Sequence, residues 1–222
     1  MFTNLFSIFD PNSSVNFSLN WLAISISFLM FPKIYWLKQN KMNFMTKLIL
    51  MFLFNEMTKL IQKKNHNNIF FFMMIFFLIL IMNFMGLFPY IFTPSSHLII
   101  TLPMSLTIWM SIIMHNWINK TNFMFAHLVP IGTPTLLMPL MVIIETISNL
   151  IRPGTLAIRL SANMIAGHLL FSLLGSTGPN LNFYLIILLI LIQILLFMLE
   201  MAVSTIQSYV FTMLSSLYSN EN

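Results

Sequence analysis

Charged side chains are rare in this chain, yet several of them lie close together inside an apolar stretch. Arg159 stands in the run TLAIRLSANMIAGHLL, which also contains Asn163 and His168. Arg152 and Glu145 come seven and fourteen residues before it. An arginine at the centre of a bilayer costs about 2.5 to 3.5 kcal/mol on insertion scales, so its presence there indicates a functional site. A guanidinium stabilises a nearby carboxylate, and histidine and glutamate side chains take up and release protons.

The composition places these residues in a membrane. Of the 222 residues, 58% are hydrophobic and 7% are charged, and the mean hydropathy is +0.88. Soluble domains have about 25% charged residues, so the chain is predicted to be an integral membrane protein. It has no cysteine, which excludes disulfides and thiolate metal sites. The spacing of His97, His115 and His127 does not fit a metal site either.

The positive charge follows the membrane pattern and does not indicate nucleic-acid binding. The formal net charge is +5, and eight of the ten basic residues lie at 33–64 and 120, between apolar segments. This is the distribution of the positive-inside rule. The first 32 residues contain Asp10 and no basic residue, which fits neither a signal peptide nor a transit peptide. We expect insertion from the side on which the chain is made.

The apolar segments predict an all-α membrane protein in one domain, residues 1–222, with about five crossing helices and one interfacial helix. Residues 43–64 carry Lys47, Asn55, Thr58 and Gln62 on one helical face, which is typical of an amphipathic helix in the interface. The expected segments are a first transmembrane helix at 14–32, the interfacial helix at 43–64, a transmembrane hairpin at 68–118 and a long, strongly tilted helical hairpin at 134–218.

The last hairpin has two possible forms. Residues 134–174 and 179–217 would each extend about 60 Å as a helix, whereas the hydrocarbon core is about 30 Å thick. Either residues 152–154 form a turn between two ordinary spans, or both segments are continuous and tilted, with a bend at 175–179. Glu145, Arg152 and Arg159 recur every seven residues, and so do Gln193, Glu200 and Gln207. These matched faces favour continuous helices, in which Pro153 causes only a kink.

Together these residues resemble the subunit a family of the F-type ATP synthases, in its mitochondrial branch. The resemblance covers essentially the whole chain. It rests on Arg159, Asn163, Gly167 and His168 in this spacing, with an acidic residue fourteen positions before the arginine. Also similar are the GSTGPN bend followed by a helix with Glu200 and Gln207, GLFPY at 86–90, and PTLLMPLMVIIETIS at 134–148.

The resemblance implies a non-catalytic stator subunit in the mitochondrial inner membrane. Such a subunit conducts protons through two offset half-channels against a rotating ring of small proteolipid subunits, with an essential arginine between the channels. Its other partners are the remaining membrane and peripheral-stalk subunits, the lipid bilayer and protons, while ATP chemistry lies in other subunits. We expect no cofactor and no nucleic acid, and the sequence has no phosphate-binding glycine loop. With the lysine-rich loops in the matrix, the N-terminus faces the intermembrane space and the C-terminus the matrix.

The expected proton-translocation residues follow from the same resemblance. On this orientation Glu145 serves the matrix path, and His168 and Glu200 serve the intermembrane path. Asn163 and His168 also fit plain interhelical hydrogen bonding, and Arg152 fits pairing with Glu145 or snorkelling. The full set is Arg159, Glu145, His168, Glu200, Asn163 and Gln207, with Arg152, Ser148, Asn149, Gln193 and Ser204 as possible supporting residues.

Two other functions are alternatives to this one. A secondary transporter or an antiporter-type subunit of a respiratory complex also uses membrane glutamate, histidine and basic residues. Such proteins usually have repeated halves, and this sequence shows none. A purely structural membrane scaffold does not explain an intramembrane arginine.

Overall fold

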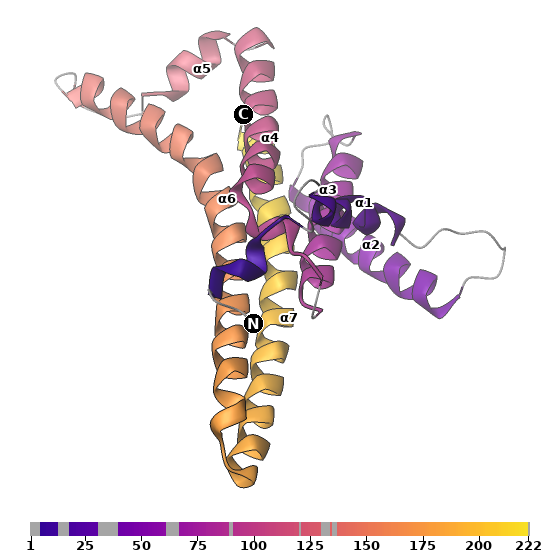
Figure 1. The fold of residues 1–222 in the computed structure, drawn as a ribbon. Helices are drawn as coiled ribbons and strands as arrows, with labels where there is room; N and C mark the ends of the chain where they lie inside the picture. The colour runs from indigo at the N-terminus through magenta and orange to yellow at the C-terminus, as the bar shows by residue number, and fades with distance from the viewer. Residues whose placement is uncertain are drawn as a thin grey trace.

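The computed structural model describes residues 5–12, 18–30, 40–60, 67–88, 91–119, 121–129, 134 and 137–221, and no strand occurs among them. The predicted all-helical class is therefore confirmed (Figure 1). The short 3₁₀ helices are η1 (Leu5–Phe9), η2 (Leu19–Trp21), η4 (Pro94–Ser96) and η6 (Gly178–Asn180). The α-helices are α1 (Leu22–Leu29), α2 (Lys41–Leu60), α3 (Asn67–Gly86), α4 (Leu98–Asn119), α5 (Thr121–His127), α6 (Met138–Thr177) and α7 (Phe183–Glu221).

Four of the described helices are long and apolar enough to cross a membrane, namely α3, α4, α6 and α7. The first of the five expected crossings, at 14–32, is described only in part. Its apolar helical segment is Leu19–Leu29, which is shorter than the roughly 20 residues that a crossing needs. The lysines at 33, 38, 63, 64 and 120, on which the expected orientation depends, lie outside the described residues.

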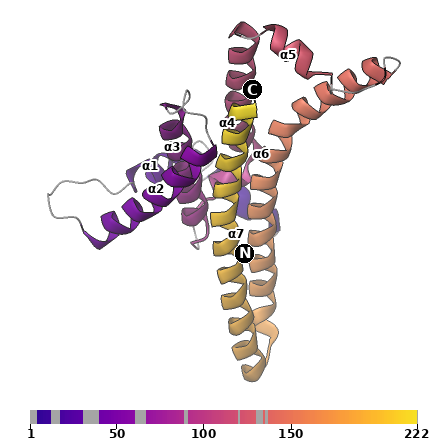
Figure 2. The ribbon, with the colours of Figure 1, turned by 180° about the vertical axis from the view of Figure 1, so that it is seen from behind.

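Helices α6 and α7 form one long hairpin and run side by side in both views of the ribbon (Figures 1 and 2). Helix α6 has 40 residues and continues through Pro153, as the continuous form of the prediction required. The bend lies later than predicted. Gly175 is still helical, and the chain turns at η6 and Leu181, whose backbone is extended. Glycine is tolerated in a helix, whereas Pro179 fits the first turn of a new one.

The core is centred on α3, which packs against α7. Large apolar side chains of α3 are buried there, including Ile69, Phe72 and Phe76. Opposite them, α7 presents small hydroxylated residues, which allow membrane helices to approach closely. These side chains are at most 3% exposed, and their hydroxyls donate to carbonyls one turn earlier in the helix: Ser204, Ser208, Thr212 and Ser215.

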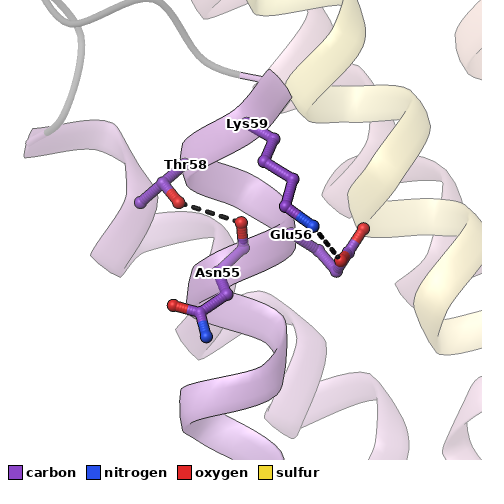
Figure 3. Close-up of polar contacts among 4 residues, drawn as sticks. All are labelled: Asn55, Glu56, Thr58 and Lys59. Atoms are coloured by element: carbon purple, nitrogen blue, oxygen red, sulfur yellow. Dashed lines mark hydrogen bonds and ion pairs between the residues drawn. The ribbon is translucent and has the colours of Figure 1, made fainter.

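Helix α2 crosses the outside of this core and contacts both α3 and α7. Only Leu53 and Met57 of α2 are buried, and most of its other apolar side chains are exposed. Figure 3 shows its polar contacts, in which Lys59 pairs with Glu56 at 2.9 Å and the Thr58 hydroxyl donates to the Asn55 carbonyl at 2.9 Å. A helix predicted over 43–64 is thus found over Lys41–Leu60, while its place in the membrane interface stays a prediction.

Gly86, the last residue of α3, is required by close packing. A methyl group added there would lie 2.7 Å from Cγ2 of Thr93 and 3.4 Å from Cε of Met164. Thr93 is 4% exposed and its hydroxyl donates to Ser96 at 3.1 Å, so it cannot move aside freely. The short loop after α3 therefore packs directly against the end of that helix.

We expect Gly86→Ala to destabilise the protein by about 1 to 3 kcal/mol, the usual cost of overpacking a core. Thermal unfolding of the purified protein in detergent or lipid measures this. Gly175→Ala is the matched control, because a methyl group there meets nothing within 4 Å. Equal unfolding temperatures for the two variants would contradict the packing argument.

Candidate functional site

Helix α6 carries seven of the predicted polar residues in order along its axis. At 1.5 Å per residue, Glu145 lies about 21 Å before Arg159, and His168 lies about 14 Å beyond it. Because α6 is one continuous helix, these separations are fixed by the backbone. The two acid-base groups therefore cannot meet each other, and the arginine stands between them.

Gly167 of α6 packs closely against Glu200 of α7. A methyl group on Gly167 would lie 2.7 Å from Cδ of Glu200 and would meet its Oε1 atom more closely still. Glycine leaves room for the carboxyl group in its present place, and a larger residue would require the flexible Glu200 side chain to move.

The Glu200 carboxyl group lies in the wall of a cavity of about 230 Å³ between α6 and α7. Asn163, Gly167 and His168 line the same cavity, so the structure brings together four residues that the sequence singled out. Glu200 is 9% exposed. Its Oε1 and Oε2 atoms and the Nε2 atom of His168 have no hydrogen-bond partner among the described residues. The cavity has room for several water molecules, which are the partners that such buried polar groups need.

The N-terminal segment covers part of this site, which the sequence did not indicate. Helix η1 packs against α6, and the ring of Phe9 contacts the His168 ring edge to face, with 6.2 Å between ring centroids. One side of His168 therefore faces an aromatic ring and another faces the cavity with Glu200. No pattern around Phe9 in the sequence predicts this contact.

Arg159 differs from the other residues of α6, because its side chain is exposed on the surface of the chain. Within the part of the chain that the structure describes, no hydrogen bond, ion pair or ring contact involves Arg159. In a membrane an exposed guanidinium is costly unless water or a carboxylate of another chain reaches it. The arginine is therefore available to a partner outside this chain.

A second charged cluster lies on the other side of Arg159. Arg152 Nη2 is 3.9 Å from Glu145 Oε1, and the Arg152 guanidinium lies over the ring of Tyr218 with 5.1 Å to its centroid. Arg152 thus lies within ion-pair distance of Glu145, while its role in a proton path stays a prediction. Both members of the ion pair are about one-third exposed, so Glu145 is held by Arg152 and also open to its surroundings.

The remaining predicted residues are less tightly grouped. Ser148 lines an open hollow of about 390 Å³ with Arg152, whereas Glu145 and Asn149 are not in its wall. Ser204 is 1% exposed and donates to the Met201 carbonyl at 2.8 Å, so it packs between helices. Gln193 and Gln207 are half-buried, and neither lines the cavity at Glu200.

The arrangement suits the passage of protons and does not suit metal chemistry. Two groups of ionisable residues occupy opposite sides of an exposed arginine on one rigid helix. Among the described residues, no three histidine, aspartate or glutamate side chains are placed to hold a metal ion. Glu200 and His168 line one cavity that has room for water, and a carboxyl group and an imidazole can both exchange protons with water.

The chain is similar to known proteins over its whole length. The family profile described as ATP synthase A chain matches residues 15–220. The ATP synthase subunit a of Drosophila melanogaster is 57% identical over 222 residues, covering 100% of this chain and 99% of the relative. The corresponding subunits of Aedes aegypti and Locusta migratoria are 54% and 51% identical over 225 and 223 residues, with the same coverage of both chains.

The contact at Gly167 gives a direct test of the cavity. Gly167→Ala should push the flexible Glu200 carboxyl group away from α6 and into the cavity, because the added methyl group occupies its place. We expect Glu200 to react several times faster with a carboxyl-selective carbodiimide, measured by mass spectrometry. Gly154→Ala is the control, since a methyl group there meets nothing within 4 Å. An unchanged reaction rate in Gly167→Ala would show that Glu200 is not seated against Gly167.

Proposed function

The chain belongs to the ATP synthase A chain family, and from this premise we propose that it is the stator subunit that passes protons to a rotating ring of proteolipid subunits. The single observation that carries the proposal is the exposed Arg159, which has no ion-pair partner among the described residues and lies on α6 between two clusters of ionisable residues. The function needs these three features together. A proton path must reach the ring from each side, and a fixed charge must separate the two paths.

Arg159 acts on a carboxylate of the ring. An ionised carboxylate in a low-dielectric region is costly, and a fixed cation opposite lowers this cost. At 4 Å and an effective dielectric constant of 20 the attraction is about 4 kcal/mol. This is enough to favour release of the ring's proton, yet small enough for the ring to move on. Arginine suits the role better than lysine, because it does not give up its own proton in proteins.

Glu200 and His168 form the path from the intermembrane space. Their shared cavity with Asn163 lies within about three turns of Arg159 on α6 and provides both water and exchangeable protons. The unpartnered Nε2 atom of His168 and the carboxyl oxygens of Glu200 are free to bind water in this cavity. Asn163 lies between the arginine and this pair, so it completes the path toward the ring.

Glu145 forms the path toward the matrix. It is partly exposed near the start of α6, and its Oε1 atom lies 3.9 Å from Arg152 Nη2. A partly exposed carboxyl group can pass on a proton that leaves the ring. Arg159 keeps a proton from crossing directly between Glu145 and His168, so every proton has to travel with the ring.

The remaining assignments follow from this function. The subunit is non-catalytic, it lies in the mitochondrial inner membrane, and it works with the other membrane and peripheral-stalk subunits of the complex. The C-terminal end of α7 and helix α5 lie at the same end of the molecule, opposite the bend between α6 and α7 (Figure 1). We place that end in the matrix and the bend toward the intermembrane space, with the N-terminus also facing that space.

The role of Arg159 predicts a specific loss. Arg159→Ala and Arg159→Lys should both abolish proton-driven ATP synthesis in an assembled complex, because the charge serves the ring and makes no contact within the described chain. The alanine variant should also leak protons passively. ATP synthesis and proton flux in reconstituted vesicles measure this, with native gel electrophoresis to verify assembly. Wild-type synthesis rates in assembled Arg159→Ala complexes would disprove the mechanism.

The assignment of the two paths can be tested with cysteine labelling, since the chain has no cysteine of its own. Ala166→Cys in the Glu200 cavity should react with a water-soluble thiol reagent from the intermembrane side only. Ser148→Cys, in the hollow beside Arg152, should react from the matrix side only. Leu188→Cys, which replaces an exposed apolar residue of α7, is the control and should react from neither side. The reverse pattern would exchange the two paths.

A further inference from the structure

Three polar side chains outside the proposed proton path are buried without hydrogen-bond partners. They are Asn83 of α3, Ser95 of η4 and Thr101 of α4, which are 0%, 2% and 3% exposed. Both amide atoms of Asn83 and both hydroxyl oxygens have no partner among the described residues. Buried polar groups of this kind are normally hydrogen-bonded, so each of these atoms requires a partner.

Neighbouring residues show that the missing hydrogen bonds are particular to these three side chains. Ser105 and Ser111 of α4 donate to carbonyls one turn earlier, at 3.1 and 2.7 Å, whereas Thr101 in the same helix does not. Ser96, next to Ser95, donates to the Thr93 carbonyl at 2.8 Å. The usual local bond is therefore available in this region, and these side chains do not use it.

All three side chains line one small cavity. It offers about 10 Å³ to the centre of a water-sized sphere, which is room for a single water molecule. The rest of the wall is apolar and includes Leu160 of α6 and Phe211 of α7. The cavity is too small for an organic ligand, and no carboxylate lines it to hold a cation.

We propose that this cavity binds one ordered water molecule, which joins α3, η4 and α4 through Asn83, Ser95 and Thr101. Water provides two donors and two acceptors, and the amide and the two hydroxyls present both kinds of group to it. A buried water of this type typically makes about three hydrogen bonds and is costly to remove. The water thus adds hydrogen bonds between α3, η4 and α4, which are otherwise joined here by apolar contacts.

The position of the site gives it a role beside the arginine. Leu160, which closes the cavity from the α6 side, is the neighbour of Arg159, and the arginine side chain faces outward. The hydrated cluster therefore braces the turn of α6 that presents Arg159. None of the residues that line this cavity also lines the Glu200 cavity, so the two cavities are distinct. The inference does not rest on the proposed function.

A high-resolution cryo-EM map of the intact wild-type complex tests the site directly. We expect one isolated density peak within hydrogen-bond distance of the Asn83 amide and of both hydroxyls. A map that shows ordered water elsewhere in the membrane sector but none here would overturn the proposal. Density continuous with the cavity at Glu200 would also overturn it, because the water would then belong to a proton path.

Two substitutions test the bridge by coupling. Asn83→Leu and Thr101→Val each remove one hydrogen-bond partner of the water. Each should lower the thermal midpoint of the assembled complex by about 2 to 4 °C. The double variant should lower the midpoint by clearly less than the sum of the two single shifts. Thr107→Val is the matched control, because Thr107 is exposed on the same helix and donates to the Met104 carbonyl at 3.1 Å, and it should change the midpoint little. Fully additive losses, or losses equal to the control, would contradict a shared water. If a variant fails to assemble, the wild-type map alone decides.

Discussion

The cost of a polar or charged group in a low-dielectric membrane is the constraint on which this structure depends. Most hydroxyls of the long helices meet it locally, by donating to a carbonyl one turn earlier, as Ser204 and Ser208 do. Arg152 meets it with Glu145 and the ring of Tyr218. Some buried groups have no hydrogen-bond partner among the described residues, and Glu200 and His168 of the proposed proton path and the three residues of the proposed water site belong to them.

The hairpin of α6 and α7 holds the polar residues of α6 at fixed positions. Its helices have no break, so the distances between Glu145, Arg159 and His168 are fixed. Gly167 lets the Glu200 carboxyl group reach α6, while small residues of α7 let the bulky residues of α3 pack from the other side. Close packing on one face and an exposed arginine on another follow from the same pair of helices.

Arg152 and Arg159 show how much the surroundings add to residue type. They are seven residues apart in sequence and were expected to share a helical face, yet one is paired and the other is exposed. A seven-residue repeat drifts by about 20° per repeat in a straight helix, and Pro153 lies between the two residues. The Arg152 guanidinium lies over the ring of Tyr218 on α7. No described residue forms a hydrogen bond, ion pair or ring contact with Arg159. The same type of side chain therefore contacts other residues of the chain at one position and faces outward two turns later.

The sequence by itself determined the helical membrane class, the continuous hairpin and the group of polar residues on α6, because hydropathy and heptad spacing are local properties of the chain. It also singled out Glu200 and His168, although their place in one shared cavity depends on the antiparallel packing of two helices. Only the tertiary structure decided the seat of the carboxyl group at Gly167, the ring of Phe9 on His168 and the cavity shared by Asn83, Ser95 and Thr101. These contacts join residues far apart in the chain, and no local pattern encodes how closely two packed surfaces meet.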